Sequence, residues 1–109
     1  MNNQEFKQML INRSFKFSLE IMKFIDLFNQ KTFSLNVIAK QLIRSATSIG
    51  ANIVEAQASS SKKDFINFIN HALKSANETR YWLGLLRDSG KVEKINSEKL
   101  FLKRSPRIF

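Results

Sequence analysis

The sequence predicts an all-α fold: an antiparallel up-down helix bundle of the four-helix type, with a short or missing fourth helix. Apolar residues recur at intervals of three and four along most of its 109 residues, which is the period of an α-helix. The chain has three glycines, one proline and no cysteine, which excludes a disulfide framework and leaves too few turn residues for an all-β fold. Its length fits one domain, with a helical core over 1–95 and a short basic segment over 96–109.

The first helix is expected over residues 4–29 and is apolar on two neighbouring faces. One face carries Phe6, Leu10, Phe17, Ile21, Phe24 and Phe28, and the other carries Phe15, Leu19, Met22 and Ile25. A helix that is apolar over so much of its circumference must be buried on more than one side. In a chain this small, the second face favours self-association.

The second helix is expected over residues 35–58, with Ser34 as its N-cap. Its centre is rich in small residues between Ser45 and Ala51, so that neighbouring backbones can approach closely. Gly50 in a helix interior costs roughly 1 kcal/mol relative to alanine, and close packing is the simplest compensation.

The third helix is expected over residues 62–89. Ser61 and Asp64 resemble a capping box at its start, and Gly90 can adopt the left-handed conformation that ends a helix. A short fourth segment is expected to begin at Asn96 or Ser97 and to end in basic residues around Pro106, which opposes helix.

Arg44 and Glu78 are expected to meet between the second and third helices. If the chain folds back around Ser60, both residues lie about 24–27 Å from the turn. An arginine–carboxylate pair partly removed from water would be bidentate and would fix the register of the two helices. The alternative is that Arg44 binds a phosphate.

The charge balance points to a polyanionic partner. Eighteen basic residues face nine acidic ones, a net charge of +9, and the chain without residues 98–109 keeps +6. Such a field attracts nucleic acid, either RNA or DNA. The candidate nucleic-acid-binding residues are Lys62, Lys63, Lys74, Arg80 and Arg87. Alternatively, Lys62 and Lys63 are solvated turn residues. Tyr81 and Trp82 could stack on bases or could pack in a core or an interface.

Several classes of protein are not expected. No stretch approaches the roughly 18 apolar residues of a membrane-spanning helix, and the N-terminus is too polar for a signal peptide, so we expect a cytoplasmic protein without a membrane partner. His71 is the single histidine, and Glu78 has Tyr81 at the third following position rather than the histidine of a di-iron bundle. We therefore expect no catalytic residue, no metal ligand and no cofactor.

The segment 41–56, QLIRSATSIGANIVEA, resembles the signature of the S23 family, also called 23S rRNA intervening-sequence proteins. The resemblance covers about residues 10–95 and continues through Ser14–Phe17, Ser61–Ile66, Ala72–Lys74 and Glu78–Leu83. It implies a four-helix bundle that often forms homopentamers and has no established catalytic residues. The sequence departs from the family pattern over residues 101–109, where the fourth helix should continue.

Two hypotheses follow from the residues and the resemblance together. The first is a non-enzymatic, self-assembling helix bundle that binds nucleic acid non-specifically through a basic surface. The second is an oligomeric protein-interaction scaffold without nucleic-acid binding of its own. The family's related branch, the accessory proteins of diversity-generating retroelements, suggests a reverse transcriptase as the kind of partner that such a scaffold would bind.

Overall fold

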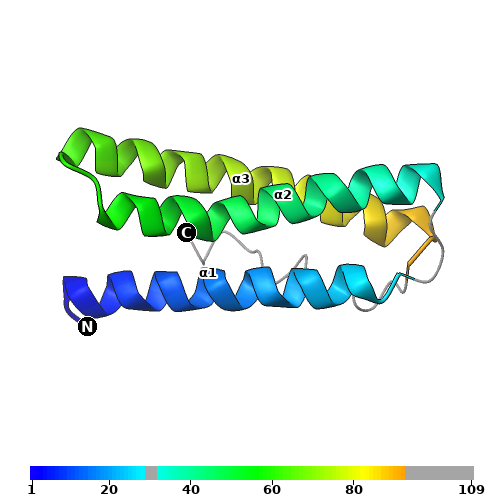
Figure 1. The fold of residues 1–109 in the computed structure, drawn as a ribbon, viewed down its shortest axis with the longest axis horizontal. Helices are drawn as coiled ribbons and strands as arrows, with labels where there is room; N and C mark the ends of the chain where they lie inside the picture. The colour runs from blue at the N-terminus through cyan, green and yellow to red at the C-terminus, as the bar shows by residue number, and fades with distance from the viewer. Residues whose placement is uncertain (29–31, 93–109) are drawn as a thin grey trace.

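The computed structural model describes residues 1–28 and 32–92, and all regular structure within these ranges is helical. Three helices follow one another in antiparallel order: α1 (Asn3–Asp26), α2 (Phe33–Gln57) and α3 (Lys62–Ser89). Helix α2 packs against both of the others, with α3 crossing it on one side and α1 running along the other (Figure 1). The all-α prediction is confirmed. The expected fourth segment, and with it residues 96–109, lies outside the described residues.

Helix α2 begins two residues earlier than the sequence predicted. Its N-cap is Thr32, whose side-chain oxygen accepts a hydrogen bond from the Leu35 backbone N–H at 3.4 Å. The expected cap, Ser34, therefore lies inside the first turn. Both residue types are good N-caps, and Thr32 takes the extended backbone conformation that the capping position requires.

Both ends of α3 agree with the sequence, whereas α1 ends earlier than predicted. Helix α1 ends at Asp26 rather than at residue 29, because the backbone N–H groups of Leu27 and Phe28 bond back three residues and tighten the last turn. At the start of α3, the Ser61 hydroxyl accepts from the Asp64 N–H at 3.1 Å, as predicted. Gly90 ends α3 with a φ of 71°, also as predicted.

The core lies between the three helices and contains mostly aliphatic side chains. Its buried apolar members are Phe17, Ile21, Phe24, Leu35, Leu42, Ala46, Ile49, Ile53, Ala56, Ala72, Ala76, Leu83 and Leu86. The middle of the first predicted apolar face of α1 is thus buried, whereas Phe6 near its start is about half exposed. Ile25, assigned by sequence to the second face, packs against this core instead.

Gly50 is the point of close approach between α2 and α1. A Cβ atom placed on it would lie 3.2 Å from the Ser14 Oγ and 3.6 Å from the Ser14 carbonyl carbon. Ser14 is buried there and satisfies its own hydroxyl by donating to the Ile11 carbonyl at 3.0 Å. The sequence predicted that a neighbouring element packs closely against Gly50. The structure shows this close packing, and the neighbouring element is α1.

We expect Gly50→Val to destabilise the fold by about 2 kcal/mol, because the added methyl groups would collide with Ser14 and push α1 away. Urea unfolding followed by circular dichroism measures this change. The matched control is Lys40→Val, ten residues earlier on α2 at an exposed position, where only a small loss of helix propensity applies. Equal effects of the two substitutions would contradict the close contact.

Candidate functional site

A series of polar contacts joins α2 to α3 and fixes their register. The Ser75 hydroxyl donates to the Ser48 Oγ at 2.9 Å, and one helical turn away the Thr79 Oγ1 lies 2.9 Å from the Ser45 Oγ. Ser45 and Thr79 are fully buried. Each has a second partner on its own helix, the carbonyl of Leu42 or of Ser75, so no hydroxyl of this pair is left unsatisfied.

Arg44 and Glu78 meet at the edge of this seam, as the spacing predicted. The Arg44 Nη2 donates to the Glu78 Oε2, and the Gln41 Oε1 accepts from Arg44 Nε and Nη2 at 3.2 and 3.0 Å. The contact joins one guanidinium nitrogen to one carboxylate oxygen, so it is not the bidentate pair expected, and the same Glu78 oxygen accepts from Trp82 Nε1 at 2.9 Å. The Arg44 and Glu78 side chains are 57% and 35% exposed, which places the pair at the surface. Such pairs add little stability, but this one orients Trp82.

The outward face of α3 carries the predicted basic residues on two lines rather than on one. At about 100° per residue, Lys63 and Lys74 fall on one line of the helix, and Lys62, Arg80 and Arg87 fall on a second line about 100° away. Lys62, Lys63, Lys74 and Arg80 are exposed. Arg87 is partly buried and pairs with Asp88, its Nη2 lying 3.1 Å from the carboxylate Oδ2.

The long middle of this face is free of carboxylates. No acidic residue occurs between Asp64 and Glu78 in the sequence. The exposed polar side chains there are neutral or basic, namely Asn67, Asn70, His71, Lys74 and Asn77. Amides and ammonium groups are hydrogen-bond donors, so this surface suits a ligand that offers acceptor oxygens and negative charge.

Tyr81 stands on the same line as Lys63 and Lys74. Its side chain is 61% exposed, whereas Trp82 is partly buried and packs against the core. The two rings meet edge to face, with centroids 5.1 Å apart and planes at 70°. Of the two aromatic residues singled out by sequence, Trp82 is a packing residue and Tyr81 is available to a ligand.

A hollow of about 430 Å³ lies beside Tyr81. It is lined by Asn77, Arg80, Tyr81, Gly84, Leu85, Arg87 and Asp88. Gly84, which leaves the space between Tyr81 and Arg87 without a side chain, lies between the two basic lines of α3. Sequence reasoning missed this hollow, because the spacing of Tyr81 and Gly84 does not show how the side chains around them are oriented.

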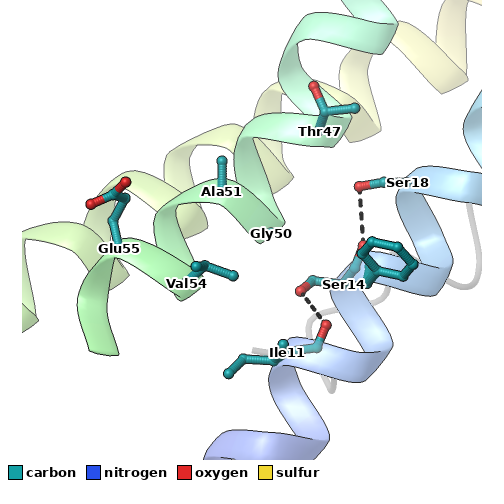
Figure 2. A pocket seen from close by; sticks show the side chains of 9 residues that line it. Ile11, Ser14, Ser18, Thr47, Gly50, Ala51, Val54 and Glu55 are labelled. Carbon is teal, nitrogen blue, oxygen red and sulfur yellow. Dashed lines mark hydrogen bonds between the residues drawn. The ribbon is translucent and has the colours of Figure 1, made fainter. Parts of the chain in front are cut away.

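A second feature is an apolar groove of about 390 Å³ between α1 and α2 (Figure 2). It is lined by Ile11, Ser14, Phe15, Ser18, Thr47, Gly50, Ala51, Val54 and Glu55. Phe15 and Val54 are 65% and 53% exposed, and Leu19 and Met22 continue the exposed apolar surface along α1. We call this surface the α1–α2 face. The sequence placed four residues on the second face of the first helix. Three of them, Phe15, Leu19 and Met22, therefore belong to the α1–α2 face.

None of the helices in residues 1–28 and 32–92 is long and apolar enough to cross a membrane. The same ranges contain no group of three or more His, Asp or Glu side chains that could hold a metal ion.

Comparison with known proteins places this arrangement in a family. The family model described as 23S rRNA-intervening sequence protein matches residues 7–105. A solved crystal structure from Bacteroides thetaiotaomicron, of a protein described as having unknown function and belonging to the S23 ribosomal protein family, is 40% identical. The match covers 91% of this chain and 90% of that one, with a TM-score of 0.81, and no curated protein matches. The chain therefore belongs to the 23S rRNA-intervening sequence protein family.

Proposed function

We propose that this chain is a non-enzymatic, self-assembling cytoplasmic protein that binds nucleic acid without sequence specificity through the outward face of α3. The observation that carries the proposal is the carboxylate-free stretch between Asp64 and Glu78, where Lys74, His71 and three asparagines face solvent. Lys63 extends this surface at one end and Arg80 at the other.

Phosphate contacts account for binding of this kind. Ammonium and guanidinium groups displace condensed counterions from the nucleic acid, and amide side chains hydrogen-bond to phosphate and sugar oxygens. A single solvent-facing helix surface of lysines and asparagines offers no preformed set of contacts to one base sequence. The proposed binding is therefore weak for one protomer and steeply salt-dependent.

Self-assembly would make this weak binding effective. The α1–α2 face lies on elements other than the outward surface of α3, so copies joined through it would leave the basic surfaces free. Repeating the same weak contact on linked copies raises the overall affinity by geometry alone. The family resemblance makes a homopentamer the expected assembly.

The α1–α2 face also favours the second candidate function, an oligomeric scaffold that binds another protein. Phe15, Leu19, Met22 and Val54 are each more than two-fifths exposed on adjoining helices. Contiguous exposed apolar surface of this kind is typical of protein interfaces. A scaffold would bind its partner through this face or through a surface created by assembly. It would not need the basic surface of α3.

We expect the double variant Lys63→Gln/Lys74→Gln to weaken binding to RNA and duplex DNA and to make it less sensitive to salt. Each lost phosphate contact should reduce the slope of log Kd against log salt concentration by about one. Fluorescence anisotropy between roughly 50 and 200 mM salt measures the slope.

The matched control is Lys16→Gln/Lys23→Gln, which removes the same charge from exposed positions of α1. A control slope equal to that of the α3 variant would show that net charge alone causes binding. Absence of binding by the wild-type oligomer at low salt would favour the scaffold function instead.

We expect light scattering to give a mass several times 12.6 kDa for the wild type and a lower mass for Phe15→Glu/Leu19→Glu. Both side chains are exposed within one protomer, so the substitutions should leave the helical circular dichroism unchanged. The control is Ile66→Glu, an exposed apolar position on α3 outside the α1–α2 face. A monomeric wild type, or dissociation by the control alone, would contradict assembly through this face.

A further inference from the structure

We infer that the hollow beside Tyr81 holds one unpaired base of a single-stranded nucleic acid, stacked on the Tyr81 ring. The inference rests on the proposed nucleic-acid binding and goes further, because it names a base-stacking site and a preference for single strands. The family description and the resemblance assign no role to this hollow.

The Tyr81 ring is exposed yet held in place. Its neighbour Trp82 meets it edge to face, and Trp82 is itself fixed by donating from Nε1 to the Glu78 Oε2. Glu78 is in turn held by Arg44 across the α2–α3 seam. A ring that is 61% exposed and supported in this way loses little conformational freedom when a base stacks on it. The Arg44–Glu78 pair thus supports the site without contacting the ligand.

The other walls of the hollow suit a nucleotide. Arg80 contributes a guanidinium group, the kind of group that pairs with phosphate, whereas Arg87 is already paired through Nε and Nη2, at 3.1 Å each, with the Asp88 carboxylate that also lines the hollow. The Asn77 amide can donate to and accept from the edge of a base. Gly84 leaves the space open between the ring and these polar groups. An aromatic wall beside cationic groups is the usual arrangement of sites that bind single strands.

The position of the hollow connects it to the basic surface. Lys74 precedes Tyr81 by seven residues on the same line of α3, which is about 10 Å along the helix axis. A strand whose base stacks on Tyr81 can therefore continue with its phosphates past Lys74. Bases in a duplex are paired and stacked on one another, so a duplex can use the lysines but cannot insert a base beside Tyr81.

The test compares short fluorescein-labelled oligouridine RNA with a mixed-sequence duplex of the same length, using the full chain in its native assembly. We expect Tyr81→Ala to weaken binding of the single strand roughly tenfold and to leave duplex binding unchanged. Tyr81→Phe keeps the ring and should bind both probes like the wild type. Light scattering on each variant shows whether the assembly is intact.

Each other outcome would overturn the inference. Equal weakening for both probes would make Tyr81 a general contact, and unchanged single-strand binding would leave the hollow without a role. A lower mass for Tyr81→Ala would place Tyr81 in a subunit contact. In each of these cases the wild type still binds nucleic acid, so the proposed function survives. Failure of the wild type to bind either probe would overturn the proposed function as well.

Discussion

The close approach of α2 to both of its neighbours is the constraint on which the rest of the structure depends. On the α3 side, the approach is made through the buried Ser45–Thr79 hydroxyl pair, and on the α1 side through Gly50 against Ser14. Small side chains allow the short spacing, and each buried hydroxyl bonds to a carbonyl of its own helix. Because polar groups in a dry interface are costly when unpaired, these contacts permit one register and penalise the others.

The positions of the two surfaces proposed for binding and for assembly follow from this central position of α2. Helix α3 turns Thr79 and the core residues toward α2, which leaves the line of Lys63, Lys74 and Tyr81 facing solvent. Helix α1 contacts α2 at Ser14, so the adjoining Phe15 lies at the rim of the groove between the two helices. The separation between the basic surface and the α1–α2 face is therefore a consequence of packing, so the proposed assembly would leave the proposed binding surface exposed.

Much of this arrangement could be predicted from sequence because helical period, caps and cross-hairpin spacing are local or nearly local signals. The α3 limits, the role of Gly50 and the meeting of Arg44 with Glu78 were all predictable in this way. The start of α2 could not be predicted in this way, because Thr32 and Ser34 are both competent caps and the choice between them depends on backbone conformation. The Tyr81 hollow was missed for another reason: it requires the relative orientation of side chains around Gly84, which spacing alone does not give.

Native-state hydrogen exchange tests most directly whether the α2–α3 seam is the rigid unit of the molecule. We expect backbone amides around Ser45–Ile49 and Ala76–Thr79 to exchange only through global unfolding, with the free energy obtained from urea denaturation. Amides of α1 should exchange through a lower-energy opening in which α1 separates from an intact α2–α3 pair. Faster exchange of the seam amides than of the α1 amides around Ile21 would contradict a rigid α2–α3 unit.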